Sequence, residues 1–141
     1  MIKYKFNDGG RKAAGYKGNA RDCVCRAIVI ATGLDYKDVY KYLAQLHYER
    51  FGTKTARNGT DNQDTLKAMK HFGLEKVSLL DRLKPTYTEA WKEFGNCVVK
   101  TTKHVAAIKD GALQDTFDGR TYEWEDETRE RKAMSIWVKK Q

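Results

Sequence analysis

The chain of 141 residues contains one proline and three cysteines, and it lacks any long hydrophobic run. Its longest apolar stretch, residues 27–31, is far shorter than the roughly 20 residues that a membrane-spanning helix needs. The first six residues alternate apolar and charged side chains, and they contain no apolar core of the kind found in signal peptides. These absences predict a cytoplasmic protein that does not associate with a membrane.

The cysteines, Cys23, Cys25 and Cys97, are odd in number. In a reducing compartment this predicts free thiols rather than a disulfide framework. A zinc site made of Cys23, Cys25 and His104 is disfavoured, because a Cys-x-Cys within one helix does not point both sulfurs at one ion. We therefore expect neither a metal nor a cofactor.

Acidic residues are fewer than basic ones, with 19 Asp and Glu against 27 Lys and Arg, which gives a net charge of +8. Such a surplus favours association with nucleic acid or with acidic proteins. The basic residues are spread along the whole chain, however, and no aromatic-basic motif of a known nucleic-acid module is present. A solubilising surface explains this pattern best, with an anionic partner as the alternative.

The secondary-structure pattern places helices early and strands late. Apolar residues at helical spacing, each time followed by glycine, predict helices near residues 23–32, 36–51, 62–72 and 88–94. Alternating or β-branched segments predict strands at 2–6, 77–80, 97–101, 104–109, 112–117, 122–124 and 134–138. This order predicts a single α+β domain over residues 1–141. Because the helix at 23–32 is apolar nearly all round, we expect it to be buried against a C-terminal antiparallel sheet.

Cys23 is the first residue of that buried helix, directly after Asp22, which is a favoured N-cap residue. The positive end of the helix dipole lowers the pKa of a thiol placed there, and the first N–H groups can face an oxyanion. Cys25 lies two residues further on and points to a different face. Cys23 is therefore the candidate nucleophile.

His104 stands at the mouth of a predicted strand, and the turn Asp110-Gly111 that follows the strand is typical of a two-residue hairpin. Pairing outward from this turn sets Ala106 opposite Asp115, so that Asp115 is a diagonal neighbour of His104 on the same face. A carboxylate in this position would fix the tautomer of the imidazole and stabilise its protonated form. The hairpin thus offers a base and a group that orients it.

Asp118 is an alternative orienting residue. A three-residue turn would shift the register by one and place Asp118, instead of Asp115, beside His104. We prefer Asp115, because the same register gathers Leu113 and Phe117 on one inner face with His104.

The motif Asp22-Cys23 at the start of an apolar helix, followed by His104-Val105-Ala106-Ala107-Ile108, a turn and Asp115, resembles the papain-like cysteine peptidase fold. It is most similar to the peptidase domains that trim leader peptides in bacteriocin exporters, and it also resembles small uncharacterised phage proteins of this type. The resemblance implies that Cys23 is the nucleophile, that His104 is the general base and acid, and that Asp115 orients the histidine. It also implies a phage-encoded protein that acts in the host cytoplasm.

The chain departs from that family at two positions. The family usually has a glutamine shortly before the nucleophile that completes the oxyanion hole, whereas this chain has Lys17 there, and the nearest amide is Asn19. The exporter domains carry glycine directly after the nucleophile, where this chain has Val24. Asn19 is therefore the expected substitute for the oxyanion donor.

Two functions follow as expectations. The first is a thiol-dependent hydrolase or acyl transferase that acts on a peptide or isopeptide bond of a peptide or protein substrate, with Cys23, His104 and Asp115 as its triad. The second is a catalytically weak or inactive papain-like binding module, which engages a host protein or nucleic acid through its basic surface. The missing glutamine and the basic loop at residues 9–21 motivate this alternative.

Overall fold

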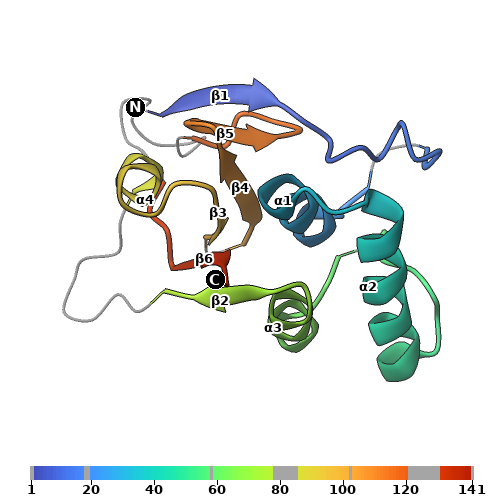
Figure 1. The fold of residues 1–141 in the computed structure, drawn as a ribbon. Helices are drawn as coiled ribbons and strands as arrows, with labels where there is room; N and C mark the ends of the chain where they lie inside the picture. The colour runs from blue at the N-terminus through green and yellow to red at the C-terminus, as the bar shows by residue number, and fades with distance from the viewer. Residues whose placement is uncertain are drawn as a thin grey trace.

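A computed structural model describes residues 2–17, 20–57, 59–77, 86–101, 103–120 and 131–140. Within these residues the chain forms a mixed α+β fold with four helices and one six-stranded sheet (Figure 1). The helices are α1 (Cys23–Thr32), α2 (Tyr36–Phe51), α3 (Asn62–His71) and α4 (Tyr87–Phe94). The strands are β1 (Lys3–Phe6), β2 (Leu74–Lys76), β3 (Cys97–Lys100), β4 (Val105–Lys109), β5 (Ala112–Asp115) and β6 (Ser135–Lys139).

The sheet has the strand order β1-β5-β4-β3-β6-β2. β1 lies parallel to β5, and the other neighbours are antiparallel. The α+β class is thus confirmed, and the C-terminal strands β3 to β6 pair antiparallel as expected, while β1 joins them in parallel and makes the whole sheet mixed. The N-terminal strand covers the otherwise open edge of β5, and a strand from the middle of the chain covers β6.

Helices cover both faces of the sheet (Figure 1). On one face, α1, α2 and α3 share a core with Val98, Val105, Ala107 and Trp137 of the sheet. On the other face, Tyr87 and Ala90 of α4 pack in a second core, together with residues that include Val99, Ala106, Ile108, Leu113 and Ile136. The sheet therefore separates α4 from the helix that bears the candidate nucleophile.

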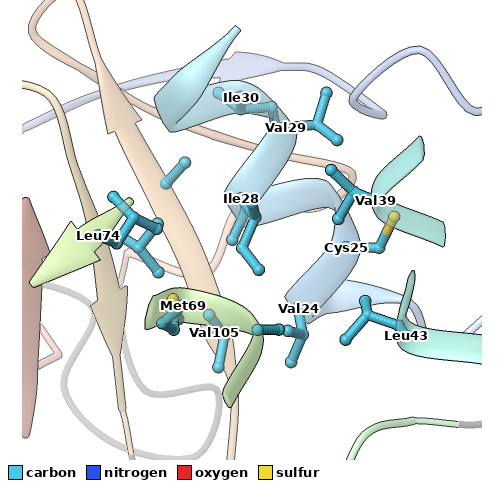
Figure 2. Packing of buried hydrophobic residues seen from close by; sticks show 14 of the residues in the cluster. Val24, Cys25, Ile28, Val29, Ile30, Val39, Leu43, Met69, Leu74 and Val105 are labelled. Carbon is cyan, nitrogen blue, oxygen red and sulfur yellow. The ribbon is translucent and has the colours of Figure 1, made fainter. Parts of the chain in front are cut away.

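α1 is buried as predicted, and its residues 24–30 are all inaccessible or nearly so. Figure 2 shows how Val24 and Ile28 point toward Val105 of β4, while Cys25 points toward α2. Full burial of a side chain such as Ile28 stabilises the fold by roughly 1.5–3 kcal/mol. The helix ends at Gly33, whose left-handed φ of 76° suits glycine and allows its N–H to bond the carbonyl of Val29.

The β4–β5 hairpin has the predicted register, with Lys109 opposite Ala112 and Ile108 opposite Leu113. Its turn residues, Asp110 and Gly111, both have positive φ, at 52° and 77°. That pair of angles is characteristic of the type I′ turn that matches the twist of paired strands. The prediction of this register is confirmed.

Three strand predictions differ from the structure or lie outside it. Instead of a strand at 77–80, the chain enters β2 at Leu74, directly after Gly73, and residues 78–80 lie outside the described residues. The strand expected at 122–124 also lies outside them. β5 ends at Asp115 rather than at 117, and the Asp115 side chain accepts the N–H of Thr116 at this point.

Among the helices that the structure describes, none combines the length and the apolar character required to cross a bilayer.

Candidate active site

Cys23 is the first residue of α1, and Asp22 occupies the N-cap position without capping the helix through its side chain. The predicted capping role of Asp22 was therefore wrong. Its carboxylate is buried and accepts hydrogen bonds from Arg26 Nη1 and from the Tyr36 hydroxyl instead. As a result, no side-chain cap competes for the N–H groups at the start of α1, where the helix dipole is positive.

His104 lies between Cys23 and Asp115. Its Nε2 is 2.5 Å from Asp115 Oδ2, which leaves Nδ1 as the ring nitrogen available to the thiol. The imidazole side chain is 13% exposed, and its ring packs against Phe117 at a centroid distance of 4.9 Å. These contacts fix the orientation of the ring, so that one nitrogen serves the carboxylate and the other serves the sulfur.

The environment of Cys23 favours the thiolate. Burial raises the pKa of Cys23, but the hydrogen bond and charge of His104 outweigh it, aided by the N–H of Val105 and the charge of Arg26. The net result is a lowered pKa for this thiol. A thiolate is the nucleophilic form of cysteine, so Cys23 has the electrostatics of a reactive cysteine.

The environment of His104 favours the imidazolium. Burial lowers the pKa of His104, but its hydrogen bonds and charge interactions with Asp115 and Cys23 raise it to about 9. A raised histidine pKa beside a lowered cysteine pKa favours transfer of the thiol proton to the imidazole. A pair shifted in this direction suits a thiolate that attacks and an imidazolium that donates a proton.

Asp115 uses both of its carboxylate oxygens within the site. Oδ2 contacts His104, while Oδ1 lies 3.1 Å from Arg26 Nη2 and 2.7 Å from the Thr116 nitrogen. Burial raises the pKa of Asp115, but the interactions with His104, Arg26 and the Thr116 N–H lower it overall. The carbonyl of Asp115 accepts the N–H of Asn7, which ties the residue to the end of β1.

Asp118, the alternative orienting residue, points elsewhere. Its carboxylate pairs with Arg120, with 2.8 Å between Oδ1 and Nε and 2.7 Å between Oδ2 and Nη2. The Asp118 side chain is also far more exposed than that of Asp115, at 42% against 4%. The structure thus places Asp115, not Asp118, against the histidine.

The three side chains meet at the ends of the strands rather than on one inner face. Ala106, Ile108 and Leu113 face α4, so the expectation that His104 and Asp115 share a face with these residues toward the nucleophile was wrong. His104 precedes β4, and Asp115 is the last residue of β5, so both side chains can reach around the end of the sheet to α1. α1 itself packs on the opposite face, against Val105 and Ala107.

Arg26 belongs to this candidate site, although no sequence pattern singled it out. It is 5% exposed on an otherwise apolar helix, and it bridges the carboxylates of Asp22 and Asp115. A buried arginine needs carboxylate partners. A single arginine on an apolar helix, one turn after Cys23, could therefore have predicted that acidic side chains lie beside Cys23. Arg26 would act as a positioning residue, because it contacts Asp115 rather than the reacting atoms.

The network extends outward to the loop after β1. Arg11 Nη1 donates to the Tyr36 hydroxyl at 2.7 Å and lies 3.6 Å from Asp22 Oδ2. Its Nη2 donates to the carbonyl of Lys17 at 3.1 Å. A continuous chain of buried polar contacts therefore connects this loop, through Asp22 and Arg26, to Asp115.

The other two cysteines have the opposite environment. Cys25 and Cys97 are buried in the two cores, and burial raises the pKa of both thiols, that of Cys97 to about 12. All three cysteines are free. Within the described ranges, no cluster of three or more His, Cys, Asp or Glu side chains could hold a metal ion.

Asn19, the expected oxyanion donor, lies outside the described residues. Comparisons with protein-family models, with curated proteins and with solved structures find no match to this chain. The arrangement joins a cysteine of lowered pKa at a helix N-terminus, a histidine of raised pKa and a buried carboxylate.

Proposed function

We propose that this chain is a thiol-dependent hydrolase or acyl transferase of papain-like fold, which acts on a peptide or isopeptide bond. The observation that carries the proposal is the position of His104, which bonds Asp115 at 2.5 Å and lowers the pKa of the Cys23 thiol. The order of the elements supports the papain-like assignment, because the cysteine opens a buried N-terminal helix while the histidine and aspartate follow on a later hairpin.

In the first half of the reaction, the Cys23 thiolate attacks the substrate carbonyl carbon and forms a C–S bond. The carbonyl π electrons move to oxygen, and the N–H groups at the start of α1, beginning with that of Cys23, stabilise the resulting oxyanion. The imidazolium of His104 then donates its proton to the leaving amine as the C–N bond breaks. A thioester remains on Cys23, and His104 is neutral.

In the second half, neutral His104 takes a proton from the attacking nucleophile, which is water in hydrolysis or an amine in acyl transfer. The nucleophile adds to the thioester carbonyl, and the C–S bond breaks. Sulfur leaves as the thiolate, while the proton stays on His104, so the ion pair is restored. Asp115 remains ionised throughout and stabilises the imidazolium in its bonded orientation.

The roles of the two aspartates give a matched test of this proposal. We expect Asp115→Asn to lower kcat/KM by about a hundredfold or more, since an amide can neither stabilise the imidazolium nor hold the required tautomer. The measurement is cleavage of a proteome-derived peptide mixture, followed by mass spectrometry. The same change should move the pKa of His104, measured by NMR titration, from about 9 toward 6.5.

Asp118→Asn is the control, because it removes a carboxylate three residues away that contacts Arg120 instead of the histidine. We expect it to change neither the cleavage rate nor the titration of His104. Equal effects of the two substitutions on both readouts would contradict the role given to Asp115.

A further inference from the structure

A cavity of about 860 Å³ adjoins the triad without containing it. Its walls come from Phe6 at the end of β1, from the loop that follows, and from Asp22, Arg26 and Thr116. Asp22 directly precedes Cys23, and Thr116 directly follows Asp115. Since Cys23 and His104 are not among the lining residues, the cavity suits a neighbouring part of the substrate rather than the reacting carbonyl. Its volume lies within the range of ligand sites in proteins, which is roughly 300–1,000 Å³.

The loop wall of the cavity is held in place by local contacts. The Asp8 carboxylate accepts the backbone N–H groups of Gly10 and Lys12, at 2.8 and 3.0 Å. Gly9 has a left-handed φ of 71° and approaches α1 so closely that an added Cβ would lie 3.2 Å from the Arg26 Cα. The cavity is therefore a built feature of the fold, because its loop is anchored both to itself and to the catalytic helix.

Positive charge dominates the lining. Lys12 and Lys17 are exposed at the cavity, and neither forms an ion pair within the part of the chain that the structure describes. The two carboxylates that line the cavity are already occupied. Asp8 accepts two backbone N–H groups, and Asp22 is buried among Arg11, Arg26 and the Tyr36 hydroxyl.

Two buried arginines add to this charge. Arg11 and Arg26 are 7% and 5% exposed, and both line the cavity. Their guanidinium groups bring fixed positive charge to the cavity wall and are held in place by Tyr36, Lys17, Asp22 and Asp115.

We propose that this cavity binds a carboxylate of the peptide substrate next to the bond that Cys23 attacks, so that the enzyme selects acidic peptides. The inference rests on the proposed function. The carboxylate can come from an Asp or Glu side chain or from a chain terminus. Phe6, which is 64% exposed, and Tyr16 provide apolar contact beside the cations, as a peptide requires. A nucleic acid would need several cations along an extended path, whereas these gather in one hollow.

The test measures peptide binding by fluorescence anisotropy, with Cys23→Ala as the parent protein so that no turnover occurs. The probes are short rhodamine-labelled peptides of Gly, Ser and Leu with a central Glu-Glu or Gln-Gln pair, each with a free or an amidated C-terminus. We expect the Glu-Glu peptide to bind about tenfold more tightly than the Gln-Gln peptide when both are amidated. If the C-terminus of the peptide supplies the carboxylate, the Gln-Gln peptide with a free C-terminus should instead bind more tightly than its amidated form.

Two double variants that each remove two positive charges distinguish binding in the cavity from general attraction by the net charge of +8. Lys12→Gln with Lys17→Gln should remove most of the preference for carboxylate, and Lys67→Gln with Lys70→Gln on the exposed side of α3 should retain it. Equal effects of the two variants would overturn the proposal, as would equal or unmeasurable binding of all four peptides. Tighter binding of a labelled oligodeoxynucleotide than of any peptide, lost in the Lys12/Lys17 variant, would assign the cavity to phosphate and overturn it too.

Failure of this inference is distinguishable from failure of the proposed function. Acidic preference in binding, without any cleavage by the protein that retains Cys23, would leave the cavity as assigned and contradict the enzyme. Cleavage that depends on Cys23 but shows no preference for acidic peptides would support the enzyme and contradict the role given to the cavity.

Discussion

Replacement of Cys23 by alanine is expected to abolish acyl transfer, with a loss in kcat/KM of about 10⁴-fold or more. The chain has no other group that can replace the nucleophile within the described site. Cys25 faces the Tyr36 carbonyl in the core, and Cys97 lies in β3. The measurement is the cleavage of a proteome-derived peptide mixture by the two proteins, with a covalent thioester sought by mass spectrometry after rapid quenching in acid.

Cys25→Ala is the matched control, since it removes a thiol two residues away on the same helix. It should leave kcat/KM within about twofold and cost about 1 kcal/mol of stability through a small cavity in the core. Activity that survives Cys23→Ala, or that disappears equally with Cys25→Ala in folded protein, would contradict the assignment of the nucleophile.

Among the proposed substitutions, Arg26→Met is expected to cause the largest loss in the free energy of unfolding, about 3–5 kcal/mol. Its side chain is 7% exposed and bridges two carboxylates whose own side chains are 1% and 4% exposed. Methionine fills a similar volume but leaves Asp22 and Asp115 as buried like charges that have lost their shared cation. Urea titration of the free energy of unfolding measures the effect.

Arg50→Met provides the comparison, because Arg50 also bridges two carboxylates, those of Asp61 and Asp64 at 3.2 Å each. Its side chain is 31% exposed and that of Asp61 is 37% exposed, so solvent screens this pair and can hydrate Asp61; only Asp64, at 5%, is buried. We expect a smaller loss of stability than for Arg26→Met, because Arg50→Met leaves one buried carboxylate instead of two. Equal losses would show that burial of the Arg26 bridge does not have the energetic weight given to it.

The parts of the fold that the sequence predicted well are local in the chain. The Asp110-Gly111 turn sets the β4–β5 register within a few residues, and this register brings Asp115 to His104. The ends of α1 and α2 are likewise marked by Gly33 and Gly52, both in the left-handed conformation. Such signals depend on turn geometry and on caps, which neighbouring residues determine.

Long-range pairings could not be predicted in the same way. The parallel contact of β1 with β5 joins Lys3 to Ala112, and nothing near either residue specifies the other. The hydrogen bond of Arg26 to Asp115 spans 89 residues. β2 was missed because only Leu74 of its three residues is buried, so the more apolar segment after it gave a stronger pattern.

The central claim is that His104 holds Cys23 as a thiolate, and the pH dependence of alkylation by iodoacetamide tests it most directly. A thiol with the ordinary pKa of about 8.5 loses reactivity about tenfold for each pH unit below that value. Cys23 has a lowered pKa, so its rate should begin to fall at a lower pH than that of an ordinary thiol, as the thiolate gains its proton.

Site-resolved mass spectrometry would follow the three cysteines in the wild type and in His104→Ala. The account predicts that at about pH 6 Cys23 reacts about tenfold or more faster in the wild type than in the variant, after allowance for the weaker intrinsic nucleophilicity of a low-pKa thiolate. Cys25 and Cys97 should remain slow in both proteins. A Cys23 rate that is the same in both proteins and falls tenfold per pH unit below pH 8.5 would contradict the account and favour a binding module without thiol chemistry.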